Sequence, residues 1–128
     1  MGQAGLGADV RTTLPATVES AHQARTWARG LLPRWGVDEA AGDVLLVLSE
    51  LVTNAVRHGR GEVRVRMARE PHLVRIEVAD DDPTPMRGRR FRSTRTSGRG
   101  LVLVSTICAQ WGVDYEPDGK TVWADVAA

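Results

Sequence analysis

The sequence predicts an α+β domain in two layers, a mixed, mostly antiparallel sheet covered on one face by about three helices. Two pairs of short segments alternate apolar and polar residues on either side of a turn, which is the pattern of a β-hairpin with one covered face. Three other segments place apolar residues at helical spacing. Strands with polar outer faces need helices over the other face, so these elements together predict two layers.

Size and composition place these elements in one globular domain. The chain has 128 residues, of which 42% are apolar, enough for a core without disulfide or metal staples. We expect residues 1–9 to be a flexible leader that lacks the features of a signal peptide, and residues 10–128 to form the domain. The lone Cys108 cannot form an internal disulfide, and no apolar run approaches the roughly 18 residues of a membrane span. Both observations favour a cytoplasmic protein without membrane contact.

The first two helices are predicted from their ends and their apolar spacing. Thr17 can cap a helix that runs to about Leu32, where a proline and a glycine follow. A second helix begins at Asp38 or Gly42 and reaches about His58, where two further glycines close it.

The remaining elements are a hairpin, a third helix that Gly112 ends, and a second hairpin. Their predicted ranges are 62–67 with 74–78, about 101–110, and 113–116 with 120–126. Pro71 and Pro117 mark the two hairpin turns. Between the hairpins, residues 83–98 form a long lid loop rich in Gly, Pro and Arg, and loops of this length in a compact domain are usually functional.

The second helix carries polar residues that its packing does not require. Its apolar arc suffices to dock the helix on a sheet, and the opposite arc contains Glu50, Asn54, Arg57 and His58. The simplest interpretation is that these groups face water. Glu50 and Asn54 nevertheless lie four residues apart, so a carboxylate and an amide oxygen can converge on one hydrated cation. Because Asn is unfavourable inside helices, Asn54 needs a further reason.

The third predicted helix opens with a segment bordered by glycines, Ser97-Gly98-Arg99-Gly100-Leu101. Glycines let the backbone approach a ligand closely, and the free N–H groups of a helix start attract phosphate. The same pattern is often only a turn, and it is neither a Walker A loop nor a dinucleotide fingerprint. Six arginines lie between Pro85 and Gly100, and a guanidinium can bind phosphate in bidentate fashion.

In chain order, three segments resemble the GHKL (Bergerat-fold) ATPases, the group of gyrase, the mismatch-repair ATPases and the catalytic domains of histidine kinases. They are Glu50-Leu-Val-Thr-Asn54-Ala-Val-Arg-His58, then Val78-Ala-Asp80 at a strand end, then Ser97-Gly98-Arg99-Gly100-Leu101. The chain looks most like the anti-sigma-factor serine/threonine kinases, because of its size, the form of the third segment, and the closing segments Trp111-Gly112 and Gly119-Lys120-x-Val122-Trp123.

This resemblance implies ATP and Mg²⁺ as cofactors and a role for each matching residue. Asn54 would ligate the Mg²⁺ that bridges the ATP phosphates, Glu50 would act as general base toward an attacking hydroxyl, and Asp80 would accept a hydrogen bond from the adenine amino group. The other ATP-binding positions would be Arg57, Asp82, Arg95, Ser97, Gly98, Arg99, Gly100 and Leu101. The resemblance also implies an anti-sigma antagonist as substrate, a sigma factor as partner, a homodimer and no direct contact with nucleic acid.

One departure from the family pattern leaves two alternatives, a protein that turns ATP over and a protein that only binds it. The first glycine box usually reads Asp-x-Gly-x-Gly, whereas this chain has Asp80-Asp81-Asp82-Pro83-Thr84. A serine/threonine kinase is the preferred prediction, and a nucleotide-gated partner-binding module without turnover is the alternative. Nucleic-acid binding by the arginine-rich loop ranks last, because the net charge is only +1 and the loop offers only Phe91 for base stacking.

Overall fold

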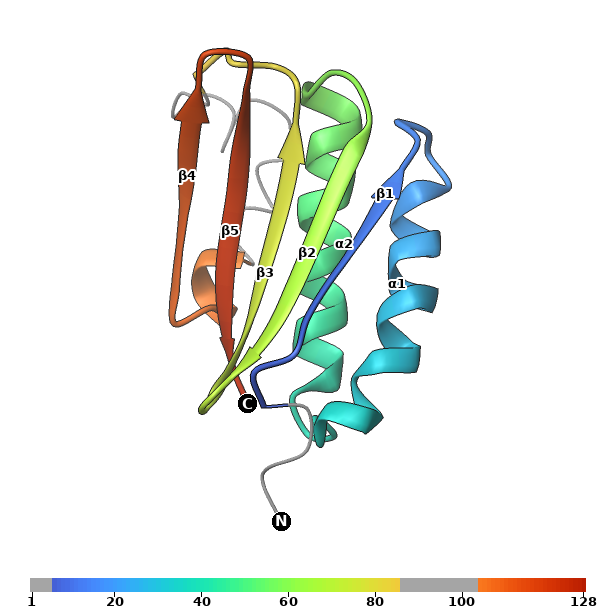
Figure 1. Cartoon of the computed structure of the whole chain (residues 1–128), viewed down its shortest axis with the longest axis vertical. Coiled ribbons are helices and arrows are strands. Elements are labelled where there is room, and N and C mark those ends of the chain that lie inside the picture. The colour runs from blue at the N-terminus through green and yellow to red at the C-terminus, as the bar shows by residue number, and fades with distance from the viewer. Residues whose placement is uncertain (1–5, 86–103) are drawn as a thin grey trace.

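The structure, a computed structural model, describes residues 6–85 and 104–128, and its main elements follow the predicted order (Figure 1). They are β1 (Asp9–Leu14), α1 (Ser20–Leu31), the 3-10 helix η1 (Pro33–Trp35), α2 (Ala41–His58), β2 (Val63–Glu70), β3 (Leu73–Asp80), β4 (Gln110–Glu116) and β5 (Gly119–Ala127). No helix of the described ranges is both long enough and apolar enough to span a membrane.

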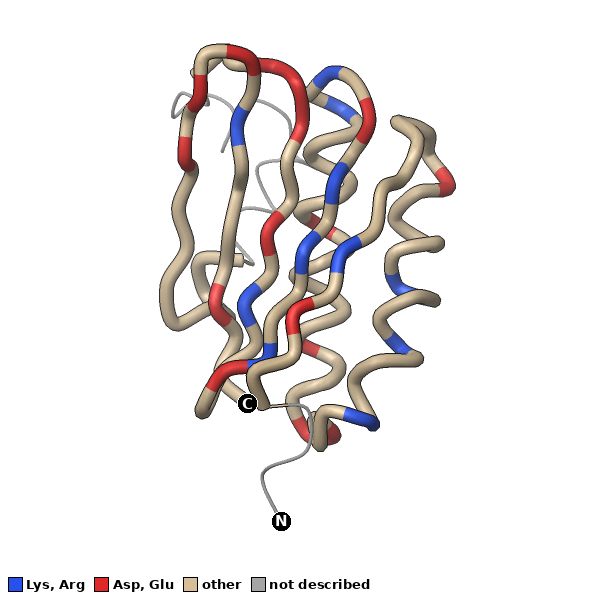
Figure 2. The backbone as a smooth tube through the Cα atoms, in the orientation of Figure 1, with Lys and Arg blue, Asp and Glu red and all other residues tan. Residues whose placement is uncertain are grey.

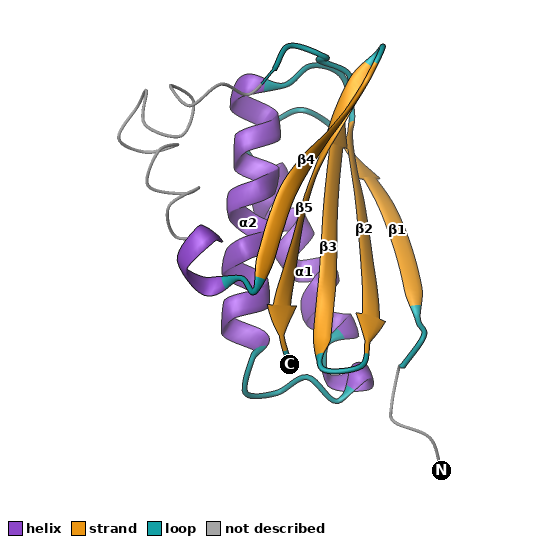
Figure 3. Cartoon of the chain, turned by 90° about the vertical axis from the view of Figure 1, so that its left-hand side faces the viewer, coloured by secondary structure: helices purple, strands orange, loops and turns teal. Residues whose placement is uncertain are grey.

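The five strands form one sheet in the order β1-β2-β3-β5-β4, and all four pairings of neighbouring strands are antiparallel. Seen from its edge, the sheet carries both α1 and α2 on the same face (Figure 3). The two predicted layers are therefore confirmed. Because β3 and β5 pair directly, the end of β3 lies beside the start of β5, with Asp80 opposite Lys120.

The core lies between α2 and the sheet. Helix α2 buries Val44, Val47, Leu48, Leu51, Val52 and Ala55, and the facing strand residues Val65, Ile76, Val78, Val122 and Ala124 are equally buried. Each of the valine, leucine and isoleucine side chains contributes about 1.5–3 kcal/mol relative to an exposed one. Helix α1 packs on α2 through Ala24 and Ala28, which are fully buried. This packing fixes the axis of α2 relative to the ends of β3 and β5.

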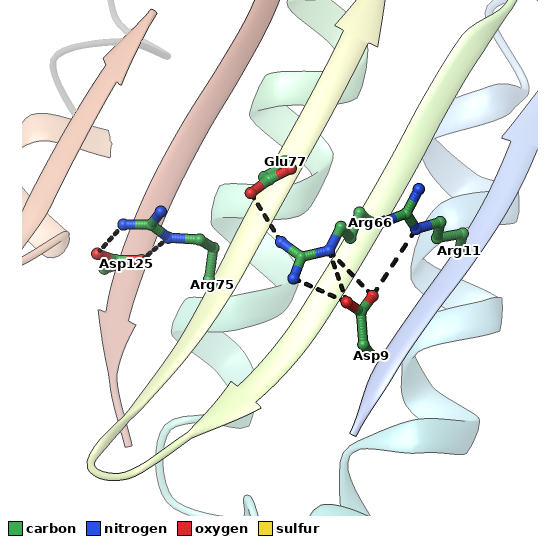
Figure 4. Close-up of polar contacts among 6 residues, drawn as sticks. All are labelled: Asp9, Arg11, Arg66, Arg75, Glu77 and Asp125. Atoms are coloured by element: carbon green, nitrogen blue, oxygen red, sulfur yellow. Dashed lines mark hydrogen bonds and ion pairs between the residues drawn. The ribbon is translucent and has the colours of Figure 1, made fainter. Parts of the chain in front are cut away.

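On the uncovered face of the sheet, ion pairs link neighbouring strands (Figure 4). Arg66 donates to both carboxylate oxygens of Asp9 and to Glu77, at 2.8–3.0 Å. Arg75 binds Asp125 through two hydrogen bonds of 2.7 and 2.8 Å, and its guanidinium carbon lies 4.5 Å from the Trp123 ring centroid. These bridges join β1, β2, β3 and β5 on the side that has no helical layer among the described residues.

Strand β1 is an element that the sequence analysis does not contain. Its residues pair with β2 from Asp9 opposite Ala68 to Leu14 opposite Val63, so ordered structure begins no later than Asp9. Just before it, the Gly7 N–H donates to the Arg69 carbonyl. Residues 1–5 lie outside the described ranges, and a flexible leader stays a prediction for them alone.

The prediction that Gly112 ends the third helix is wrong. Residues 104–107 form a helical turn, and β4 already begins at Gln110, so Gly112 lies inside a strand opposite Trp123. A Cβ at Gly112 would come within 2.8 Å of the Trp123 indole. The glycine therefore makes room for an aromatic ring rather than stopping a helix. Residues 101–103, the predicted start of that helix, lie outside the described residues.

Candidate functional site

The polar residues of interest gather where α2 ends, β3 ends and β5 begins. Acidic residues are concentrated at this end of the sheet, along the end of β3 and the turn between β4 and β5 (Figure 2). The backbone holds the corner together, because the N–H of Asp81 donates to the carbonyl of Arg60 in the loop after α2, at 2.7 Å. The loop after α2 and the end of β3 are thereby held together.

Asp80 is the centre of this corner and is only 2% exposed. Its Oδ1 accepts the backbone N–H of Asp82 at 2.7 Å and the Lys120 Nζ at 3.1 Å, and its Oδ2 lies 3.1 Å from the same nitrogen. Lys120 is as buried as Asp80, and it also donates to the carbonyl of Asp82 at 3.1 Å. A buried carboxylate and a buried ammonium thus neutralise each other, as their burial requires.

Two glycines give this carboxylate cluster its close packing. A Cβ at Gly59 would lie 2.5 Å from Cγ of Asp80, and one at Gly61 would lie 2.0 Å from Oδ2 of Asp81. Gly61 also has a left-handed φ of 75°, which favours glycine. The sequence pattern predicts for these glycines only the end of a helix. Their second function is to bring the end of α2 against the end of β3.

Asp82 is held by its own local contacts. Its carboxylate accepts the backbone N–H of Thr84 at 3.0 Å and lies 3.6 Å from the Arg60 guanidinium. The hydrogen bonds from Thr84 lower the pKa of the Asp82 carboxyl, with Lys120 and Arg60 acting in the same direction. Among the described residues, this side chain therefore shapes the turn that follows β3.

Asn54 is buried, with 5% of its surface exposed, although the simplest interpretation of the sequence placed it in water. Its Oδ1 has no hydrogen-bond partner among the described residues. An unpaired buried amide oxygen costs about 1–3 kcal/mol, so it normally marks a place where a ligand, water or ion binds. No group of three or more His, Cys, Asp or Glu side chains in the described ranges could hold a metal without further ligands. A cation at Asn54 would need oxygens from a bound molecule.

Glu50 lies one helical turn before Asn54 and is half-buried. Burial raises the pKa of the Glu50 carboxyl, and the positive charge of Arg57 opposes this rise. A carboxylate with a raised pKa is a stronger base, which suits proton abstraction from a hydroxyl. Arg57 itself is exposed and borders a hollow of about 240 Å³ between α1 and α2.

The structure brings some of the predicted site residues together and leaves others undescribed. Asn54 and Glu50 lie on one helix, whose end packs through Gly59 against Asp80. The predicted positions Arg95, Ser97, Gly98, Arg99, Gly100 and Leu101 fall outside the described residues.

Lys120 is the functional candidate that the sequence analysis missed. A signal was present, because Lys120 continues the alternation of Val122, Ala124 and Val126, which face the core. A lysine on the buried face of a strand requires an acidic partner. What the strand pattern does not reveal is which of the chain's carboxylates that partner is.

A two-layer α+β domain with one helix ending on a strand-end carboxylate is the architecture expected of a GHKL-type ATPase. Residues 14–126 match the family model described as histidine kinase-like ATPase domain. The chain therefore belongs to the histidine kinase-like ATPase domain family, a class that implies ATP as ligand. The comparison with curated proteins gave no match.

Two solved structures share this fold. The RsbU and RsbW domains of Rv1364c from Mycobacterium tuberculosis superpose with a TM-score of 0.69 at 23% identity, over 94% of this chain and 33% of that one. The histidine kinase domain of the blue-light activated histidine kinase from Erythrobacter litoralis EL346 gives a TM-score of 0.54 at 26% identity, over 70% and 45%. This chain thus spans less than half of either protein's length.

Proposed function

We propose that the chain is an ATP- and Mg²⁺-dependent serine/threonine kinase that phosphorylates an anti-sigma antagonist and sequesters a sigma factor. The family supplies the ATP-binding fold, and the sequence resemblance to anti-sigma-factor kinases supplies the substrate and partner. The observation that carries the proposal is the buried Oδ1 of Asn54, which has no hydrogen-bond partner within residues 6–85 and 104–128, on the helix that packs against Asp80. A homodimer and a cytoplasmic location are further predictions from the same resemblance and from the sequence.

The site fits a magnesium ion held jointly by the protein and a nucleotide. Mg²⁺ binds hard oxygens, keeps several waters and is commonly held by one or two protein groups plus substrate phosphates. Asn54 offers one such oxygen, already removed from water and free of competing donors among the described residues. When bound, the ion would neutralise charge on the phosphates as the phosphoryl group is transferred.

Glu50 and Asp80 supply the other two functions. Glu50, with its raised pKa, would take the proton of the acceptor hydroxyl. Asp80 would hold the base, because Oδ2 retains acceptor capacity beside its pairing with Lys120. Phosphoryl transfer depends mainly on positioning and charge stabilisation, so these few groups suffice in principle.

The Asn54 assignment is tested by calorimetric titration of ATP with and without Mg²⁺. The wild-type chain is expected to bind ATP more tightly with Mg²⁺, and Asn54→Ala should bind with the same affinity in both conditions. Thr53→Ala is the matched control, since Thr53 is adjacent on α2 but borders the hollow between the helices. If ATP binding by Asn54→Ala depends on Mg²⁺ as it does in the wild type, Asn54 does not ligate the ion.

A nucleotide-gated binding module without turnover is the second candidate, and one observation favours it. The Asp80 carboxylate is already engaged by Lys120 and by the Asp82 N–H, and the glycines of the usual first box are absent. ADP formation from ATP in the presence of the acceptor protein, measured for wild type and Glu50→Gln, separates the two. A kinase loses this turnover in Glu50→Gln while keeping nucleotide affinity, whereas a passive module shows none in either protein.

A further inference from the structure

Lys120 is the one lysine of the chain and its side chain is 1% exposed. It stands at the start of β5, on the face that buries Val122, Ala124 and Val126. A buried ammonium is tolerated only when it is paired with an anionic partner. Its partners are therefore a fixed part of the fold and do not exchange with water as a surface pair would.

The hydrogen-bonding capacity of the pair can be counted. A carboxylate offers about four acceptor positions and an ammonium three donors. In Asp80, Oδ1 already accepts from Asp82 N–H and from Lys120 Nζ, whereas the contact given for Oδ2 within residues 6–85 and 104–128 is Nζ at 3.1 Å. Lys120 Nζ donates a second hydrogen bond to the Asp82 carbonyl at 3.1 Å. Within the part of the chain that the structure describes, acceptor capacity thus remains mainly on Oδ2, which lies 3.1 Å from Nζ, and two of the three Nζ donors are accounted for.

A ligand that hydrogen-bonds to Oδ2 must consequently come within reach of Nζ. The pair presents an acceptor and a donor side by side, whereas a lone carboxylate presents acceptors only. Adenine has a donor at N6 next to an acceptor at N1, and guanine or hypoxanthine has an acceptor at O6 next to a donor at N1. Both arrangements match the pair, while the O6 of a 6-oxopurine would be repelled by a carboxylate alone.

We propose that Lys120 is a specificity-determining residue that lets the base site accept 6-oxopurine nucleotides as well as adenine nucleotides. The inference rests on the proposed function, because it assumes that Asp80 holds the base. Lys120 donates to O6 while Oδ2 of Asp80 accepts N1–H, or the same two groups meet N1 and N6 of adenine. A site with a lone aspartate would instead select adenine.

The experiment measures the dissociation constants of ATP, GTP and ITP for the full chain, each with Mg²⁺, by competition against a fluorescent ATP analogue. GTP and ITP are expected to bind within about tenfold of ATP. In Lys120→Met the ratio of GTP to ATP dissociation constants should rise about ten- to hundredfold, since O6 loses its donor and faces a carboxylate. Arg64→Met is the matched control: its guanidinium pairs with the neighbouring Asp81 at 3.0 Å, on a half-exposed site, and its loss should leave the ratio unchanged.

Each result decides the question. Rejection of GTP and ITP by more than tenfold in the wild-type chain overturns the proposal, and so does a ratio that Lys120→Met does not raise. If circular dichroism shows that Lys120→Met does not fold, the wild-type ratios decide by themselves. Absence of binding for all three nucleotides overturns the proposed function itself, and is distinguishable from a site that binds ATP alone.

Discussion

Replacing Gly59 with alanine tests the close packing of α2 against the end of β3. The new Cβ would lie 2.5 Å from Cγ of Asp80, 2.6 Å from its Oδ2 and 2.6 Å from the carbonyl oxygen of Ala55. Ordinary contacts begin at 3.4 Å, so the shortest of these falls short by about 0.9 Å. Neither neighbour yields readily, because one is backbone and Asp80 is held by Lys120 and by the Asp82 N–H.

The expected magnitude follows from two opposing effects. Inserting a methyl group into packed surroundings costs about 1–3 kcal/mol. The backbone of Gly59, with φ −94° and ψ −167°, is accessible to alanine. Alanine restricts the unfolded chain more than glycine does, and this stabilises the folded state by about 0.4–1 kcal/mol. The free energy of unfolding should therefore fall by up to about 2.6 kcal/mol, with a central value of about 1.3 kcal/mol, which lowers Tm by about 4 °C per kcal/mol in a domain of this size.

Gly42→Ala provides a control of opposite sign. Gly42 lies in the first turn of the same helix, and a Cβ there meets nothing within 4 Å. Alanine is the better helix former, so this variant should gain about 0.5–1 kcal/mol. Urea unfolding followed by tryptophan fluorescence measures both, since Trp35 is buried in the core. A Gly59→Ala protein as stable as Gly42→Ala would refute the packing argument.

Two further predictions concern single titratable groups. Burial raises the pKa of Glu50 above 4.5, so the folded protein binds this proton more tightly than the unfolded chain, and Glu50 lowers stability as the pH rises above about 4.5. The stability of Glu50→Gln relative to wild type, from unfolding curves, should increase between pH 4 and 7; a constant difference contradicts this. Burial, with Asp125 and Asp43 nearby, raises the pKa of Cys108 from 9.0 to about 11, so at pH 8 its thiolate fraction is about 100-fold below that of an ordinary thiol. A thiol-reactive chromophore should react that much faster after unfolding in urea, and equal rates in the folded and unfolded protein are the contrary result.

Local sequence periodicity was sufficient for most of the fold. The helix ending at His58 and the two hairpins were predicted because apolar spacing and turn residues act over a few neighbours. Edge strand β1 was missed, because pairing with β2, 49 to 59 residues later in the chain, establishes it as a strand. Gly112 was misinterpreted for a similar reason, since only the opposite strand shows that the glycine faces the Trp123 ring.

The candidate site also has features that the sequence predicts and features that only the folded structure decides. By itself, the sequence determined that Glu50 and Asn54 share one side of a helix, because a spacing of four residues fixes their relation wherever the helix packs. Only the tertiary structure decided that Asn54 is buried, that Gly59 touches Asp80, and that Lys120 pairs with a carboxylate forty residues earlier in the chain. Burial and pairing depend on which surfaces meet after folding, and helical or strand periodicity carries no information about a partner so distant in sequence.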